Sequence, residues 1–278
     1  MIEGEDELRV GGLTLRGVTR GGIQTCVMVP ELDLMFDVGG SVRGQQRFST
    51  ILVSHGHQDH LGGLPYLISQ RGLSGLPGPA VHVPVEIAVP LTRIFESWSE
   101  IEGFALQVGL HGHAPGEVVE LGASTAATCV RSVHRVPSLA WIVERTSGRL
   151  KAEFVGREGA ELAELRRAGV HVTEPYVADV LCVTGDTQIE LWDREPRVRT
   201  SKVLVHEITA WDQRRTVEET RAWGHTHVDE LIERAEQFEG EALVLVHRSP
   251  RHTRAEAEQV IATRFPASVR DRIHVFGR

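Results

Sequence analysis

The stretch that decides the fold reads Ser-His-Gly-His-Gln-Asp-His and occupies residues 54–60. It places three histidines and an aspartate within six positions, and a Leu-Gly-Gly turn follows at 61–63. Directly before it, the sequence Thr-Ile-Leu-Val at 50–53 predicts a short buried strand. Imidazole and carboxylate groups on one short turn can converge on a divalent cation, and a strand end is a usual place for such chemistry. The stretch therefore predicts a metal site at the end of a strand.

The composition limits the class of protein. The chain has 278 residues, of which 41% are hydrophobic, enough for one large domain or two small ones. Its three cysteines lie far apart without a Cys-x-x-Cys pair, which argues against a disulfide framework and suits a reducing compartment. The acidic start at 1–7 and the lack of a long apolar run predict no signal peptide, no membrane contact and a cytoplasmic location. The net charge of −8 gives no general support for nucleic-acid binding.

Strand-like runs alternate with helical patterns along the whole chain. Short β runs with Gly and Pro turns fill residues 8–53, and helical spacing appears in both halves. We expect helices at 61–71, 86–98, 161–167, 228–238 and 255–265, and further strands near 104–108, 117–120, 126–133, 139–145, 180–183, 203–208, 243–246 and 273–276. No linker or repeat divides the sequence. It therefore predicts a single α/β domain, residues 1–278, with layered sheets.

Several apolar runs end directly in a residue that could bind a metal or move a proton. Five such positions are His55, His134, Asp186, Glu207 and His247. One histidine after a strand is more often a hydrogen-bonded structural residue, but five strand ends of this kind in one chain indicate a composite metal centre. Asp37 also follows a strand and precedes two glycines. It can fold back on backbone amides to brace a neighbouring loop, or it can simply cap its own turn.

With these distant partners, the motif resembles the metallo-β-lactamase superfamily over essentially the whole chain. The resemblance implies a four-layer αββα sandwich, in which two β-sheets pack face to face, helices lie outside, and the metal site sits at one edge. It also implies two zinc ions per chain, with manganese or iron as alternatives. The implied ligands of one ion are His55, His57, His134 and Asp186, and those of the other are Asp59, His60, Asp186 and His247, so that Asp186 bridges.

Four further segments resemble the short form of tRNase Z (ribonuclease Z). They are Phe-Asp-Val-Gly at 36–39, His-Arg-Val-Pro-Ser at 134–138, Glu207 followed by Thr209, and Gly-His-Thr-His at 224–227. This resemblance implies a homodimeric endoribonuclease that binds precursor tRNA, removes its 3′ trailer and leaves a 3′-hydroxyl. Asp59 would orient or deprotonate the attacking water. His225, held by Glu207, would stabilise the transition state or protonate the leaving oxygen.

The sequence also departs from the family pattern. His-Arg-Ser-Pro-Arg-His at 247–252 replaces the usual His-Phe-Ser-x-Arg-Tyr, Ala140-Trp141 replaces Gly-Tyr, and residues 148–173 form a reduced version of the family's tRNA-gripping arm. These departures leave phosphodiester chemistry intact and the substrate open. The alternative is a hydrolase of a small phosphodiester, sulfate ester or lactone at the same centre. Candidate substrate contacts are Arg71, Pro137, Ser138, Arg248 and Arg251, and a scaffold role suits Arg71 equally well.

The remaining histidines show no pattern that predicts a site. His206 should point away from Glu207 if its strand is regular, because successive side chains face opposite sides of a sheet. The others, expected to be surface or hydrogen-bonded residues, are His82, His111, His113, His171 and His274.

Overall fold

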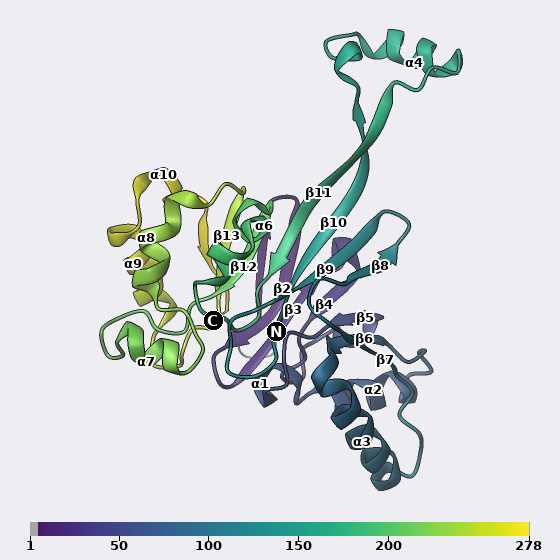
Figure 1. Cartoon of the computed structure of the whole chain (residues 1–278). Coiled ribbons are helices and arrows are strands. Elements are labelled where there is room, and N and C mark those ends of the chain that lie inside the picture. Colours follow the sequence, from purple (N-terminus) through teal and green to yellow (C-terminus); the bar gives the residue numbers. More distant parts are fainter. Residues whose placement is uncertain (1–4, 278) are drawn as a thin grey trace.

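The computed structural model describes residues 5–277 and contains two seven-stranded mixed sheets (Figure 1). The first four residues of the acidic start, and Arg278, lie outside this range. The first sheet, in spatial order, comprises β1 (Asp6–Val10), β2 (Leu13–Arg20), β3 (Gln24–Val29), β4 (Leu34–Phe36), β5 (Thr50–Leu52), β6 (Ala80–Pro84) and β7 (Gly109–His113). The second comprises β14 (Ile273–Val275), β13 (Ala242–Val246), β12 (Val203–Glu207), β11 (Thr173–Val183), β10 (Leu139–Leu150), β9 (Thr125–Arg131) and β8 (Val118–Gly122).

Helices cover the outer faces of both sheets. Those of the first half are α1 (Gln58–Leu61), α2 (Leu64–Leu73) and α3 (Val85–Glu102), and α4 (Gly159–Arg167) lies apart. Those of the second half are α5 (Leu191–Arg194), α6 (Pro196–Thr200), α7 (Val217–Ala222), α8 (Val228–Arg234), α9 (Arg254–Arg264) and α10 (Ala267–Arg270). In Figure 1, α2 and α3 lie beside β5–β7, whereas α8 and α9 lie beside β12 and β13.

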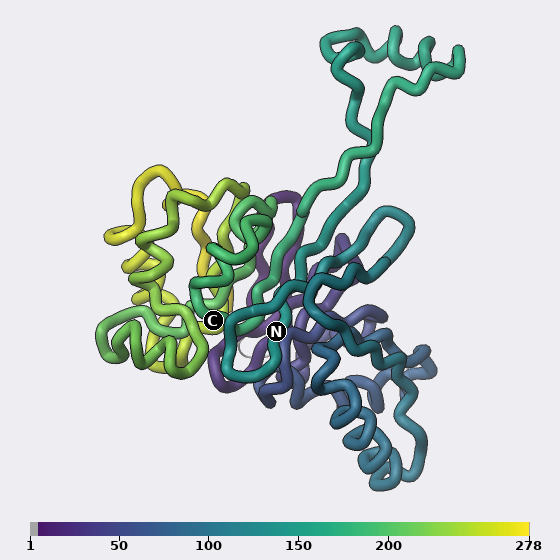
Figure 2. Tube along the Cα trace, in the orientation of Figure 1, coloured from purple at the N-terminus to yellow at the C-terminus, as the bar shows by residue number. Residues whose placement is uncertain are grey.

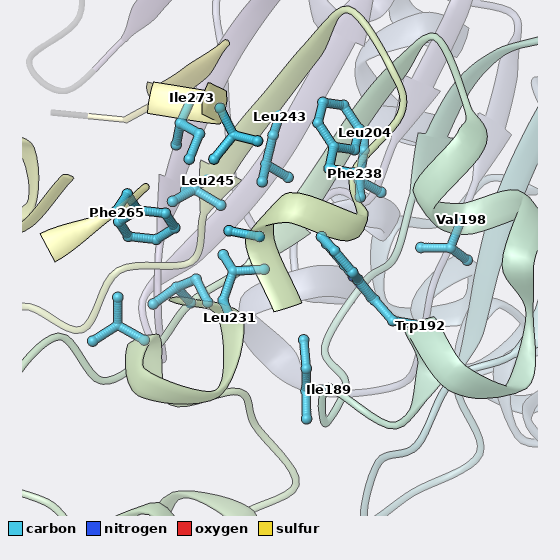
Figure 3. Packing of buried hydrophobic residues seen from close by; sticks show 14 of the residues in the cluster. Ile189, Trp192, Val198, Leu204, Leu231, Phe238, Leu243, Leu245, Phe265 and Ile273 are labelled. Atoms are coloured by element: carbon cyan, nitrogen blue, oxygen red, sulfur yellow. The ribbon is translucent and has the colours of Figure 1, made fainter. Parts of the chain in front are cut away.

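Three apolar clusters separate the four layers. One lies between the two sheets and contains Leu15, Phe36 and Trp141. A second lies between the first sheet and α2 and α3, and a third lies between the second sheet and its helices (Figure 3). The alternation of strand side chains explains this division: in β12, Val203 and Val205 belong to the cluster between the sheets, and Leu204 to the outer one. The predicted αββα sandwich is confirmed.

A two-stranded ribbon projects from the body. β10 and β11 pair in antiparallel fashion from Trp141↔Val183 out to Leu150↔Thr173, and α4 lies at the tip (Figures 1 and 2). Beyond Glu144 the ribbon's side chains are mostly exposed. The arm therefore begins closer to the body than the predicted 148–173, since both strands of the second sheet continue into it.

Some expected elements differ from the observed ones. The strand expected at 104–108 is wrong, because the seventh strand of the first sheet is β7, whose sequence Gly-Leu-His-Gly-His has no apolar alternation. Neither β1 nor α7 was predicted from the sequence. Within residues 5–277, no helix is long and apolar enough to cross a membrane.

Candidate metal centre

The metal-type side chains lie at one edge of the sandwich because their strands end there. Strands β11, β12 and β13 are parallel, so the residues that follow them, among them Asp186 and His247, emerge at the same edge. β9 and β11 both run antiparallel to β10, so they run in the same direction and end at the same edge. His134 follows β9 and therefore lies at this edge too. β4 and β5 in the other sheet are parallel and bring Asp37 and His55 to the facing edge.

The first group of donors consists of His55, His57, His134 and Asp186, with one atom from each lying within 4.8 Å of the others. His57 Nδ1 lies 3.0 Å from His55 Nε2 and 3.3 Å from His134 Nε2. Asp186 Oδ2 lies 3.6 Å from His55 Nε2. Burial, together with the neighbouring imidazoles, holds the pKa of His55 well below its usual value, so this ring is neutral and keeps a lone pair for a cation.

The second group consists of Asp59, His60 and His247, whose atoms also lie within 4.8 Å of one another. Asp186 faces this group too, since its Oδ1 lies 3.3 Å from His60 Nε2 and 3.4 Å from His247 Nε2. Asp186 thus turns one carboxylate oxygen to each group. Burial opposes its charge, but His247 and His60 outweigh this and hold the pKa of Asp186 well below its usual value.

Two buried atoms at the centre lack a hydrogen-bond partner among the described residues: His60 Nε2 and Asp186 Oδ1. Buried polar atoms are rarely left unpaired, and here both face a cluster of nitrogen and carboxylate donors. A divalent cation that accepts imidazole and carboxylate ligands, such as zinc, would satisfy both atoms. The donor set therefore fits the metal that the sequence analysis expected.

Two buried carboxylates fix the orientation of the histidines. Asp37 accepts from the backbone N–H of Ser54 at 2.7 Å, from its hydroxyl at 2.8 Å, and faces His60 Nδ1 at 2.7 Å. The Ser54 hydroxyl, having donated to Asp37, accepts from His55 Nδ1 at 3.0 Å. Because a carboxylate only accepts, both imidazoles carry their proton on Nδ1 and present Nε2 to the centre. The loop-bracing alternative for Asp37 is the one that the structure contains.

Glu207 plays the equivalent part on the other side. It accepts from the Thr209 hydroxyl at 2.9 Å, and that hydroxyl accepts from His247 Nδ1 at 2.8 Å. Glu207 Oε1 also lies 2.8 Å from His225 Nδ1. Burial opposes the charged form of His225, but Glu207 outweighs it and raises the pKa of His225 to about 9. His134 is fixed differently, with its Nδ1 2.7 Å from the carbonyl of Gly224.

The remaining predicted residues divide into those at the centre and those outside it. Asp59 is at the centre: its Oδ2 accepts from the N–H of Gly22 at 2.8 Å and lies 3.4 Å from His247 Nε2. Burial opposes ionisation of Asp59, but the adjacent imidazoles of His247 and His60 outweigh it and lower the pKa of Asp59 to about 2. The carboxylate is therefore ionised at neutral pH. Pro137 and Ser138 belong to the loop beside it, where the buried Ser138 hydroxyl donates to the Asp186 carbonyl at 3.4 Å.

Arg71 and Arg248, two of the candidate substrate contacts, bind backbone carbonyls in the structure, and for Arg71 this is the scaffold alternative. Both are buried, with 3% and 5% exposure. The Arg71 guanidinium donates to the carbonyls of residues 46, 48 and 77, and that of Arg248 to the carbonyls of residues 252 and 277. Both side chains brace loops through these bonds. Arg251 is exposed and lines a pocket beside His225 and His247.

Three histidines assigned no partner form a cluster outside the centre. The parallel pairing of β6 and β7 puts His82 opposite His111, and the two rings stack with centroids 5.1 Å apart. His82 Nδ1 lies 2.9 Å from His113 Nε2. The i, i+2 spacing of His111 and His113 was the available signal, but their contact with His82 depends on a register that the sequence does not show. His206 does point away from Glu207, and its ring lies 5.7 Å from that of Trp192.

A two-sheet sandwich whose edge carries two groups of histidine and aspartate donors sharing one carboxylate defines a metal-dependent hydrolase. Residues 38–248 match the family described as Beta-lactamase superfamily domain. The metallo-beta-lactamase fold protein YhfI of Bacillus subtilis superposes with a TM-score of 0.63 at 14% identity, covering 93% of each chain. The human short form of tRNase Z superposes with a TM-score of 0.59 at 16% identity, also covering 93% of each.

Comparison with curated relatives shows which family of this superfamily the chain belongs to. The chain is 30% identical over 263 residues to tRNase Z TRZ1 of Arabidopsis thaliana, covering 94% of both chains. It is 31% identical over 251 residues to the chloroplastic tRNase Z TRZ2 of the same plant, covering 89% of this chain and 70% of the relative. The chain therefore belongs to the tRNase Z family of the beta-lactamase superfamily.

Proposed function

We propose that the protein is a zinc-dependent endoribonuclease that removes 3′ trailers from precursor tRNA. The observation that carries the chemistry is the pair of donor groups that share Asp186, with the Glu207–His225 pair beside them. The relatives named tRNase Z, similar over nearly the whole chain, support RNA as the substrate. Zinc is the proposed metal, and cytoplasm stays the predicted location.

The residues have separable roles. Two zinc ions bound by these ligands would lower the pKa of a water molecule enough to supply hydroxide near neutral pH. Asp59 is ionised and held by the Gly22 N–H, so it would orient that water by accepting a hydrogen bond. His225, with Nδ1 fixed by Glu207, would use Nε2 to give a proton to the leaving 3′ oxygen. Cleavage would leave a 3′-hydroxyl on the tRNA.

The projecting arm is evidence for a large substrate. β11 runs 11 residues from the tip toward Asp186, so at about 3.3 Å per residue the tip lies roughly 35 Å from the centre. The arm can therefore serve a substrate that extends well beyond the metal centre, as a folded RNA does. We propose a homodimer in which one subunit's arm holds tRNA for the partner's centre, and sedimentation analysis with and without tRNA tests that assembly.

The decisive assay compares substrates. The zinc-loaded protein is given precursor tRNA with a 3′ trailer, a chromogenic phosphodiester and a lactone in parallel. Trailer removal that Asp59→Ala abolishes supports the proposal. Turnover of the phosphodiester or lactone without tRNA cleavage refutes it in favour of a small-molecule hydrolase.

A further inference from the structure

A pocket opens beside the proposed catalytic pair and is lined by arginines. It has a volume of about 380 Å³, and His225 and His247 form part of its wall. The other lining residues are Gly21, Gly22, Thr209, Ala210, Arg214, Arg215, Trp223, Ser249, Pro250, Arg251 and His252. The lining contains no carboxylate, although the chain as a whole carries 38 acidic and 30 basic residues. The pocket is therefore suited to an anion.

Trp223 gives this pocket an aromatic wall. It follows α7, and its side chain is 54% exposed. The next residue, Gly224, has a φ of +82°, and a Cβ there would lie 2.6 Å from His134 Nδ1. The chain between Trp223 and His225 therefore passes tightly against His134, where only glycine fits. The indole is thus fixed beside the centre while much of it stays open to solvent.

Arginines without acidic partners surround the indole. The guanidinium carbons of Arg135 and Arg215 lie 4.7 and 5.9 Å from the centroid of the Trp223 ring. Within residues 5–277, neither makes a salt bridge, and nor does Arg251. Arg214 differs, since its Nε lies 2.6 Å from Asp212. Both guanidinium groups lie over the ring, so a stacked base would take the place of one of them there. Arginines without carboxylates to neutralise them, beside an exposed aromatic ring, match a ligand that has both a flat ring and a phosphate.

From this arrangement we infer that Trp223 is a stacking platform for the base of the nucleotide next to the cleaved phosphate, and that Arg135, Arg215 and Arg251 bind the flanking phosphates. The inference rests on the proposed function, because it assumes a nucleic-acid substrate at the neighbouring centre. Stacking on an aromatic ring tolerates every base, since each has a π face. The subsite would therefore recognise a nucleotide without reading a particular sequence.

Isothermal titration of the zinc-loaded protein tests the platform without requiring turnover. The probes are adenosine 5′-monophosphate and ribose 5-phosphate, which share the phosphate and the sugar and differ by the base. We expect the wild type to bind the nucleotide about tenfold more tightly. Trp223→Ala should reduce this ratio to near one while leaving ribose phosphate affinity unchanged, and Trp223→Phe should retain most of it. The matched control is Trp98→Ala on α3, another exposed tryptophan with 43% exposure, which should retain the full ratio.

An unchanged ratio in Trp223→Ala, or no preference for the nucleotide in the wild type, overturns the inference. Cleavage of precursor tRNA is scored separately. If tRNA is cleaved but the ratio ignores Trp223, the proposed function stands and the platform does not. If tRNA is not cleaved but the ratio depends on Trp223, the platform stands and the tRNA substrate is refuted.

Discussion

Replacing Asp37 by Asn should weaken metal binding although Asp37 is not a proposed ligand. The carboxylate is 2% exposed and accepts at both oxygens, from the Ser54 N–H at Oδ1 and from His60 Nδ1 at Oδ2. An amide has only one accepting atom. If its NH₂ faces Ser54, that NH₂ and the Ser54 backbone N–H are two donors facing each other without an acceptor. If it faces His60, that imidazole moves its proton to Nε2 and blocks the nitrogen that points to the metal.

The magnitude follows from these contacts. A buried donor left without its acceptor costs about 1–3 kcal/mol, and losing the charge weakens the surviving bonds by roughly 1 kcal/mol more. We therefore expect Asp37→Asn to lower the free energy of unfolding of the metal-free protein by about 3 kcal/mol. Residues that orient metal-binding histidines typically contribute a factor of about 10–100 to metal affinity, and we expect a loss in that range for zinc.

Urea unfolding of the metal-free protein and zinc competition against a chelator measure the two effects. The matched control is Asp33→Asn. Asp33 also has a left-handed backbone, with φ 52° against 58° for Asp37, but it is exposed and remote from the centre. Asn tolerates this conformation, so neither change adds backbone strain. A loss of stability with zinc affinity within twofold of wild type would show that Asp37 braces the loop without setting the His60 proton, and the reasoning would fail.

Three further changes test the other parts of the structure. His225→Ala should lower kcat by about 10²–10⁴ with zinc content unchanged, and loss of zinc would instead make His225 a ligand, as its position within 4.8 Å of Asp186 and His247 allows. Replacing the arm tip, residues 151–172, by a Gly-Ser turn should abolish tRNA binding and its steep salt dependence but leave hydrolysis of the chromogenic phosphodiester unchanged. Equal losses of activity on both substrates would contradict an arm that binds tRNA. Burial lowers the pKa of His206 to about 4 from 6.5, so the native state should lose about 3 kcal/mol of stability as pH falls from about 6.5 toward 4. His206→Leu should remove that loss in urea titrations of the metal-free protein. An unchanged pH profile would show that protonation of another group causes the loss.

The sequence predicted the layers because burial imposes a pattern on the residues. Strands such as β12 and β13 have two buried faces and appear as continuous apolar runs, and their C-terminal ends identified Glu207 and His247. The arm ribbon and β7 were misjudged because they lack that constraint. Beyond Glu144 the ribbon faces solvent on both sides, so nothing selects apolar residues there, and its strands could not be told from loop.

The pocket could not be predicted from the sequence, for a different reason. Arg135, Arg215 and Trp223 come from three loops, and no spacing in the sequence announces that they meet. The one local signal was Gly224, already noted for its place before His225. Its role as the tight passage against His134 depends on the neighbouring strand end, which becomes visible only when the two sheets are packed.

Two acids that are not among the metal donors organise the centre. Asp37 sets the proton of His60 directly and that of His55 through the Ser54 hydroxyl, and Glu207 sets those of His225 and His247, the latter through Thr209. Each acid lies at the end of a strand, one in each sheet. The relative position of the two sheets therefore fixes where His55, His60 and His247 present their free nitrogens and where His225 presents its Nε2 proton. The ligands also leave strand ends of both sheets, so a change in the packing between the sheets would shift the ligands and these two acids together, and a rigid sandwich therefore suits this chemistry.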